Sequence, residues 1–537
     1  MRAMFKSLSS ARVVAGLAAA MGSLYAIGSL AAVPGITGTG SSPSFALSAG
    51  EALSNQPDGL MIYSWGYGCS SQPAGFAPAG LSGATCPSAQ LPGPTMIVHE
   101  GDTVTVALTN NLPAAAGNTS IYFPGFNVTA TGGHPGVLVQ EAPNGAACNK
   151  TANPGCNTVT YSFVASTPGT HSYYSGTQGS IQVEMGLFGA IIVLPSTTPT
   201  ACQDANNVSR AASNANGETD YRLAKNAYNH ASTCYDREYL AQLSEIDAKV
   251  HVQAKAQVDA NTACTSEGGC LNIVTEPYEP TYYLINARSF PDDADPSYAP
   301  AYPNQPYNMN PHGHPGELVL LRVIGQGRMQ HPFHEHGNHM RVLGRDGNLL
   351  VSSTDATKLA GPLSFTTASV PGMAIDSIFY WTGKGVNWDV YGHGFAGDTS
   401  VCIPDANGYY TSEPTAPNFY EWCGDHNKAL ERNPLGQVAS GGPMTLPDPN
   451  IVLNGAWYSG SAYLSGDANA RSTGSTPLPP FGTVLNSNSI SSYAFMWHSH
   501  DEREITTANV FPGGMMSMML VDPRQSLGAP VSIDESL

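Results

Sequence analysis

Glycine and proline interrupt this chain at short intervals, which limits the elements that it can form. Its 537 residues include 57 glycines and 41 prolines, and only 12% of them are charged. Glycine and proline supply the backbone conformations that turns need, and proline also breaks helices. The runs between them are rich in Val, Ile, Thr and Tyr, as is typical of β-sandwiches. The sequence therefore predicts an all-β fold rather than a helical bundle.

The predicted strands fall into two groups, which indicate two sandwich domains at residues 51–196 and 233–523. Strands of the first domain are expected at 95–99, 103–109, 159–164 and 191–194. Those of the second are expected at 282–286, 317–324, 340–343, 377–381 and 493–497. A short helix is predicted at 246–260.

The remaining segments are predicted from their composition. Residues 33–50 are rich in Gly, Ser and Pro, which favours a disordered lead-in. Residues 197–232 are polar with little periodicity, which indicates a linker or an insertion. A long loop is expected at 383–481, either a functional loop or an elaborated cap. Residues 524–537 are predicted to be a disordered tail.

The amino-terminal end predicts export. Arg2, Lys6 and Arg12 precede an apolar run, and residues 1–32 have the pattern of a signal peptide. The alternative is an uncleaved membrane anchor, because the apolar run is nearly long enough to span a bilayer. With cleavage no membrane span remains, and the protein is expected to be secreted, periplasmic or at the cell surface.

The 10 cysteines are an even number, which favours disulfides in an exported chain. The simplest pairing joins sequence neighbours: Cys69 with Cys86, Cys148 with Cys156, Cys202 with Cys234, Cys264 with Cys270, and Cys402 with Cys423.

Two histidine clusters carry the chemistry. One is the string from His331 through His334 and His336, and the other holds His498 and His500. Alternate residues of a strand point the same way, so each pair of histidines two residues apart shares a face. If the two strands are neighbours, four imidazoles converge on a site suited to copper, zinc or another borderline metal. The alternative is two hydrogen-bonded surface pairs.

These strings resemble those of multicopper oxidases. HPFHEHG at 331–337 is similar to the family's His-Pro-x-His-x-His-Gly, and WHSH at 497–500 with Met515 downstream is similar to its closing His-Cys-His and methionine. LPGPTMIVHEGDTVTVALTNNL at 91–112 resembles the family's first domain. The resemblance implies tandem cupredoxin-like Greek-key β-sandwiches. It also implies a copper centre that oxidises a substrate while reducing oxygen to water.

The family's blue (type 1) copper site is incomplete in this sequence. Ser499 occupies the position of its cysteine, and Glu504 occupies the ungapped position of its second histidine. A hydroxyl cannot supply the soft thiolate of a blue copper site. By resemblance, His331 and Met515 are the metal-site residues that remain there.

The family also has a trinuclear cluster, which is three copper ions bound by eight histidines. Half of those histidines are missing from this sequence. The cluster's four first-domain histidines align with Tyr122, Pro124, Tyr174 and Gly176. The second-domain half of the cluster remains and is expected to bind copper. It consists of His334, His336, His498 and His500. An oxygen ligand would shift the preference toward iron or manganese. Such a ligand could come from Glu335, Glu502 or Glu504. Alternation places Glu335 on the face of its strand opposite to His334 and His336.

Other histidines and methionines have simpler interpretations. His134 and His171 lack motif support, and His312 and His314 are predicted in a turn with exposed side chains. The segment with Met515, Met516, Met518 and Met519 fits either soft copper(I) ligands or, by preference, the packing of a buried strand.

The first hypothesis is therefore a secreted, multicopper-oxidase-like, copper-binding oxidoreductase that acts on a small molecule or a metal ion. The alternative is a non-catalytic cupredoxin scaffold with a structural, surface or metal-binding role. Two-domain members of the family form trimers, so the resemblance is compatible with a homo-oligomer. The net charge of −18 argues against nucleic acid as a partner.

Overall fold

The computed structural model describes residues 32–78, 81, 83–381 and 493–522, with isolated positions at 401–416 and 525–533. Nearly all of the predicted signal peptide and of the 383–481 loop lies outside these residues, as does the expected pair of Cys402 and Cys423. Each predicted strand overlaps a strand of the structure. The four other expected disulfides are present.

Two five-stranded sheets form the first domain, in the orders β11-β12-β5-β1-β4 and β3-β2-β6-β10-β7. The alternation of buried and outward residues along β6 and β10 shows that their sheet buries one face. Residues of both sheets share one core, which includes Trp65, Tyr67 and Tyr161. The strands are β1 (Gly35–Thr37), β2 (Ser44–Asn55), β3 (Met61–Cys69), β4 (Gly75–Ala77), β5 (Met96–His99), β6 (Thr103–Asn110), β7 (Thr129–Gly132), β10 (Thr158–Val164), β11 (Gly169–Tyr174) and β12 (Phe188–Leu194).

The second domain is also a two-sheet sandwich. One sheet has the order β14-β13-β16-β22-β18-β19, with β20 paired to β18, and the other has the order β15-β24-β23-β17-β21. Phe333, Trp497 and Met519 lie in the core of this domain. Its strands are β13 (Arg237–Ile246), β14 (Tyr282–Ile285), β15 (His312–Gly313), β16 (Leu318–Gly325), β17 (His331–Glu335), β18 (Met340–Arg345), β19 (Asn348–Leu349), β20 (Leu363–Ser364), β21 (Thr366–Ser369), β22 (Ala374–Tyr380), β23 (Tyr493–Ser499) and β24 (Met516–Val521).

Short helices and ladders complete the fold. The helix expected at 246–260 is confirmed as α4 (Ala248–Ala260), whose Asp247 cap accepts a hydrogen bond from the Lys249 N–H. The other elements are α2 (Gly179–Gln182), α3 (Val208–Ala215), β8 (His134–Pro135), β9 (Gln140–Glu141) and three 3-10 turns at Ala114–Ala116, Thr200–Cys202 and Asp292–Ala294. None of the helices in the described part of the chain is long and apolar enough to cross a membrane.

Two predictions from composition need correction, and the segment predicted to be a linker or an insertion contains a helix. The lead-in at 33–50 is not disordered, because β1 pairs with β5 and the start of β2 pairs with β6. The polar segment 197–232 contains α3, which is capped by the Asn207 side chain. In the tail, β25 (Gln525–Ser526) pairs with β26 (Ala529–Pro530). The partners of the lead-in, β5 and β6, lie far away in sequence, which composition does not reveal.

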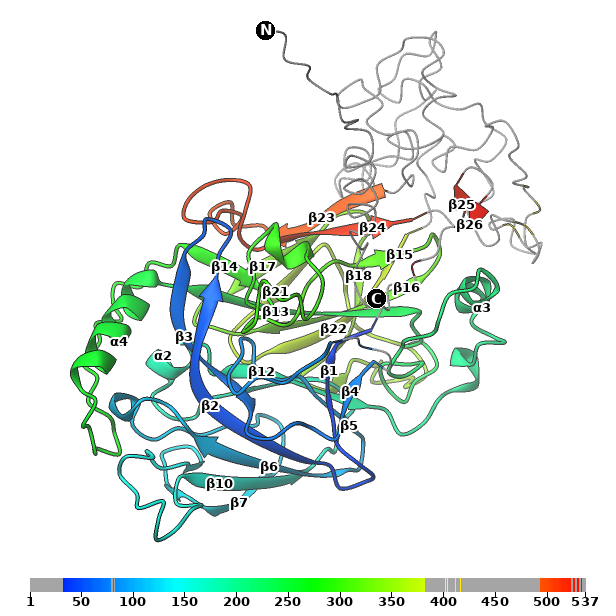
Figure 1. The fold of residues 1–537 in the computed structure, drawn as a ribbon. Helices are drawn as coiled ribbons and strands as arrows, with labels where there is room; N and C mark the ends of the chain where they lie inside the picture. The colour runs from blue at the N-terminus through cyan, green and yellow to red at the C-terminus, as the bar shows by residue number, and fades with distance from the viewer. Residues whose placement is uncertain are drawn as a thin grey trace, which may run out of the picture.

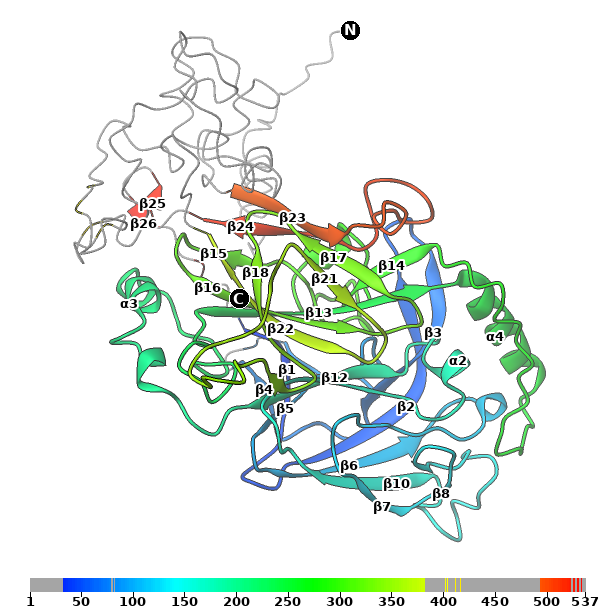
Figure 2. The same cartoon turned by 180° about the vertical axis from the view of Figure 1, so that it is seen from behind.

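The histidine-bearing sheet lies on the far side of the second domain from the first domain. Figures 1 and 2 show β23, β24 and β17 at one end of the molecule and β6, β10 and β7 at the other. The junction is made by the other sheet, where Ile97, Ile192, Leu240 and Ile324 belong to one apolar cluster. The histidine site is therefore not shared between the two domains of one chain.

Candidate metal centre

The two histidine motifs lie on neighbouring antiparallel strands. In the β17–β23 ladder, His334 is opposite His498 and Phe333 is opposite Ser499. Directly opposed residues project from the same face. Gly337 ends this stretch with a φ of 102°, where a side chain would meet the Phe495 ring at 3.0 Å. The glycine of the motif is thus needed to turn the chain after the last histidine.

Four imidazoles meet on the outer face of this sheet. The ring centroids of touching pairs are 4.7 to 5.9 Å apart among His334, His336, His498 and His500. The closest approach is 3.2 Å, between the Nε2 atoms of His336 and His498. We call these four residues the histidine quartet.

Burial lowers the pKa of three of the four imidazoles. Burial, followed by repulsion from the other imidazoles, lowers the pKa of both His334 and His336 to about 4. Burial also lowers the pKa of His498. The His498 Nδ1 lies 2.6 Å from the Ser499 carbonyl oxygen. Because a carbonyl only accepts, this contact puts the proton on Nδ1 and leaves a lone pair on Nε2.

The quartet fits a metal ion in part. Two nitrogens bound to one ion at about 2.0–2.1 Å with tetrahedral angles lie about 3.3 Å apart, close to the 3.2 Å between His336 and His498. His334 has its Nδ1 2.8 Å from the Thr366 hydroxyl, a contact that orients the ring. Within the described residues, no group of three His, Cys, Asp or Glu side chains is arranged to hold an ion. The structure therefore provides two converging nitrogens and two further rings in contact with them.

The position of the blue copper is filled by hydrogen-bonded charges. His331 is fully buried, with Nε2 2.9 Å from a Glu245 oxygen and Nδ1 2.9 Å from a Glu504 oxygen. Although burial opposes it, these two carboxylates raise the pKa of His331 to about 9. The Ser499 hydroxyl donates to the same Glu504 oxygen at 2.5 Å. We call these four residues the Glu–His–Glu cluster.

A blue copper does not fit the Glu–His–Glu cluster. It has no thiolate, and both nitrogens of His331 are bound to carboxylates. Met515 packs in the core of the domain, and its backbone N–H donates to the Glu504 carbonyl oxygen. The predicted ligands His331 and Met515 thus both contact Glu504, but the nitrogens of His331 are bound to carboxylates and Met515 packs in the core.

The three candidate carboxylates lie away from the quartet. Glu335 points into the opposite face, as alternation predicts, and its burial raises its pKa well above the usual range. Neither of its carboxylate oxygens finds a hydrogen-bond partner in the described part of the chain. Glu502 is exposed, and Glu504 belongs to the Glu–His–Glu cluster.

The isolated histidines also have other partners. His134 pairs with Glu267 at 2.7 Å, and the His171 ring packs at a tilt against the Phe126 ring. The prediction that His314 is exposed is wrong, because it is 2% exposed and its Nε2 lies 2.5 Å from a Glu218 oxygen.

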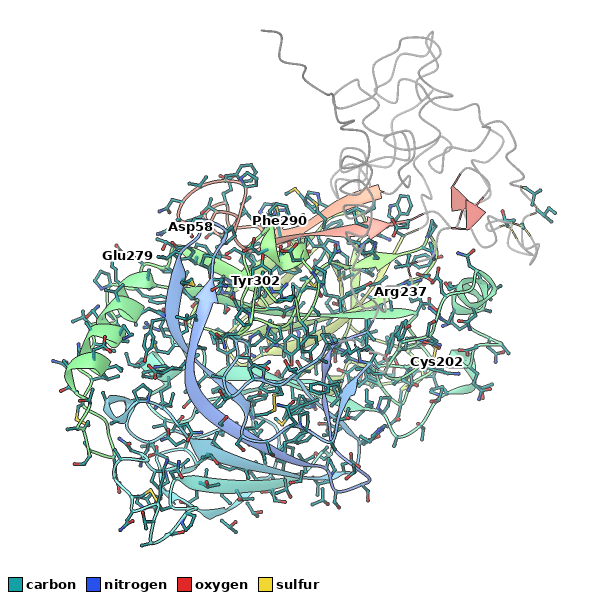
Figure 3. The ribbon with its side chains drawn as sticks, in the orientation of Figure 1. Asp58, Cys202, Arg237, Glu279, Phe290 and Tyr302 are labelled. Carbon is teal, nitrogen blue, oxygen red and sulfur yellow. A yellow bond between two sulfur atoms is a disulfide. The ribbon has the colours of Figure 1, made fainter. Side chains whose placement is uncertain are left out.

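Sequence reasoning missed a buried ionic network around Arg237, a residue that is labelled in Figure 3. Arg237 bonds both Glu218 and Glu317. Nearby, burial and then the Glu317 charge raise the pKa of Asp236 to about 6. These partners are separated by 19 and 80 residues along the chain, so no local pattern marks them.

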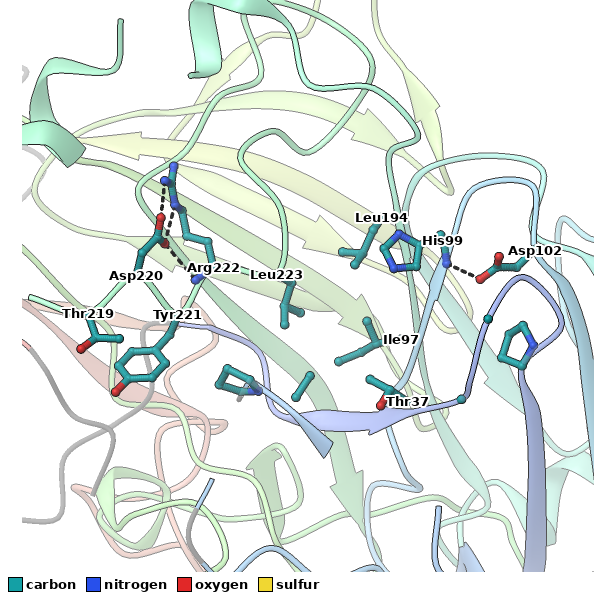
Figure 4. A pocket seen from close by; sticks show the side chains of 15 residues that line it. Thr37, Ile97, His99, Asp102, Leu194, Thr219, Asp220, Tyr221, Arg222 and Leu223 are labelled. Carbon is teal, nitrogen blue, oxygen red and sulfur yellow. Dashed lines mark hydrogen bonds and ion pairs between the residues drawn. The ribbon is translucent and has the colours of Figure 1, made fainter. Parts of the chain in front are cut away.

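Two pockets in the described part of the chain lie away from the quartet. One of about 570 Å³ is lined by His99, Tyr221 and Arg222. Its arginine is already paired with Asp220 (Figure 4). The other, about 410 Å³, is bordered by Tyr174 at the domain junction. Neither pocket brings together the predicted ligands.

The chain is similar to known multicopper oxidases. Models of the multicopper oxidase family match residues 83–198 and 275–378. No curated protein matches in sequence. A solved multicopper oxidase called mgLAC is 17% identical, with 91% of this chain and 87% of that one covered and a TM-score of 0.43. A blue copper oxidase from Nitrosomonas europaea is 16% identical, with 89% and 85% covered and a TM-score of 0.42.

One family match falls in each sandwich, and the second ends at residue 378, before the strands β23 and β24 of the histidine sheet. The chain belongs to the multicopper oxidase family of cupredoxin proteins.

Proposed function

We propose that the protein is an exported, copper-binding oxidoreductase whose metal site is the histidine quartet. The observation that carries this proposal is the 3.2 Å approach of the His336 and His498 Nε2 atoms. Bound copper would supply one-electron oxidation and reduction, and iron or manganese is the alternative metal. The substrate class is a small molecule or a metal ion.

The protein's own residues prepare this site. The Ser499 carbonyl fixes the tautomer of His498, and the Thr366 hydroxyl holds His334. Such outer contacts orient ligands and set their basicity. Neutral imidazoles with depressed pKa values leave their lone pairs available at physiological pH.

The site is reduced relative to the family pattern. Tyr122 and Tyr174 align with first-domain positions where the family has histidines. The centroids of their two rings are 5.6 Å apart. With the Glu–His–Glu cluster at the blue-copper position, the family's usual route for electrons has no entry point. The proposed chemistry is therefore confined to the quartet.

The second candidate function is a non-catalytic cupredoxin scaffold. Two observations favour it: the charges that fill the blue-copper position, and the lack, among described residues, of three converging His, Cys, Asp or Glu donors. The quartet opposes it, because four clustered imidazoles add nothing that a scaffold needs.

Elemental analysis of the purified protein, taken from metal-replete medium, tests the proposal. We expect about one copper per chain, and none in the His336→Ala/His498→Ala double variant. His134→Ala is the matched control, because His134 is half exposed and pairs with Glu267 instead. A wild-type protein that stays metal-free after reconstitution would leave the scaffold as the function.

A further inference from the structure

We infer that Met496 and Met516 complete the histidine site and make it selective for cuprous copper. The inference rests on the proposed metal role of the quartet. It follows from the register of three adjacent strands, β17, β23 and β24.

The first row of the site crosses all three strands. His334 is opposite His498 in the β17–β23 ladder. His498 is opposite Met516 in the β23–β24 ladder. Because directly opposed residues of antiparallel strands share a face with their Cβ atoms about 4.5–5.5 Å apart, these three side chains stand side by side. Met516 is 3% exposed.

A second row lies next to the first. The His336 N–H donates to the Met496 carbonyl at 3.0 Å, so His336 and Met496 are opposed, and Met496 is in turn opposite Met518. Met496 also precedes His498 by two residues, which puts it on the same face of β23. It therefore borders both of the histidines whose Nε2 atoms meet.

The other methionines show that this face is distinct from the core. Met515 and Met519 alternate with Met516 and Met518, and they pack in the hydrophobic core of the domain at 0% and 1% exposed. The preference for core packing is thus confirmed for Met515 and Met519. Met516 and Met518 point the other way, toward the histidine side of the sheet.

The donor chemistry favours a soft, singly charged ion. Within the described residues, the third and fourth donors do not come from His, Cys, Asp or Glu. Thioethers are soft ligands that select copper(I), whereas carboxylates suit harder ions. The thioethers of the methionines carry no charge, and the cost of desolvating an ion rises with its charge. A partly buried His/Met site therefore suits Cu⁺ better than Cu²⁺ or Zn²⁺.

The test is anaerobic competition for Cu⁺ between the protein and a chromogenic chelator. We expect the Met496→Leu/Met516→Leu variant to bind Cu⁺ at least about tenfold more weakly, with Zn²⁺ binding unchanged. Leucine keeps the volume and apolar character of methionine. Met519→Leu is the matched control, because it changes the same strand on the core side.

Two results would overturn the inference. If the double variant, folded as judged by circular dichroism, holds Cu⁺ as tightly as wild type, the methionines are not ligands, and the proposed function survives through its histidines. If wild type binds neither Cu⁺ nor Cu²⁺, the inference and the proposed function fail together. X-ray absorption of the Cu⁺-loaded protein checks the same point directly, because copper–sulfur scattering must disappear in the double variant.

Discussion

The Ser499 hydroxyl donates a hydrogen bond to the Glu504 carboxylate at 2.5 Å. By the resemblance of the sequence, these residues align with a copper-binding cysteine and histidine of the family, and the Glu504 carboxylate also bonds His331. Glu504 thus provides one carboxylate that accepts the hydrogen bond of the Ser499 hydroxyl and pairs with the His331 ring.

Restoring the cysteine alone will not restore a blue copper. In Ser499→Cys, Glu504 and Glu245 still hold both nitrogens of His331. We expect no intense visible absorption band after copper is added to this variant. The triple variant Ser499→Cys/Glu504→His/Glu245→Gln frees His331 and supplies the missing ligands, so it is the informative comparison. A blue Ser499→Cys protein would show that the carboxylates do not block the position.

Removing the imidazolium should destabilise the fold in a pH-dependent way. His331→Gln removes the positive charge between the two buried carboxylates of Glu245 and Glu504, which costs about 3–5 kcal/mol near neutral pH. The folded pKa of about 9 lies above the ordinary value, so the stabilisation is full below about pH 6.5 and is lost as pH rises through about 9. Thermal unfolding of wild type and variant across this range measures it. Parallel pH profiles for the two proteins would contradict the assignment.

Metal should remain bound in mild acid. Because the pKa of His334 and His336 is about 4, protons compete for these nitrogens only as pH falls toward that value. We expect the metal content to hold at about pH 5.5, where ordinary histidines are mostly protonated. Equilibrium dialysis over a pH series gives the profile. Loss of metal centred near pH 6.5 would indicate exposed, unperturbed histidines as the ligands.

Asp236→Asn should stabilise the protein at neutral pH. Burial and the Glu317 charge raise the pKa of Asp236 to about 6, so its charged form opposes folding above that pH. The gain is about 2 kcal/mol at pH 7, and it should vanish below about pH 4. The asparagine carbonyl can still accept the hydrogen bond from the Leu318 N–H. Urea unfolding of wild type and variant at about pH 7 and about pH 4 measures this difference in stability. An equal gain at both pH values would indicate that packing, not charge, is the cause.

Local pattern was enough to predict the strands and the faces that their side chains share. Alternation placed His334 and His336 together and Glu335 on the opposite face, because the side-chain period of a strand is a local property. The lead-in at 33–50 was predicted wrongly because its glycines and serines resemble a linker, whereas its strands form by pairing with β5 and β6.

The partners of His331 could not be predicted from local sequence, because they are also distant along the chain. Glu245 and Glu504 lie 86 and 173 residues away, and only the folded sheet brings them together. The same holds for Met496 and Met516, whose shared face depends on the register of β23 with β24.

The Glu–His–Glu cluster is complete without an ion, and the domain junction is on the other side of the sandwich. A newly made chain can therefore finish both domains before it meets any metal. If the quartet binds an ion as proposed, that ion can enter or leave while the scaffold stays folded, so metal occupancy would follow supply rather than decide whether the protein survives.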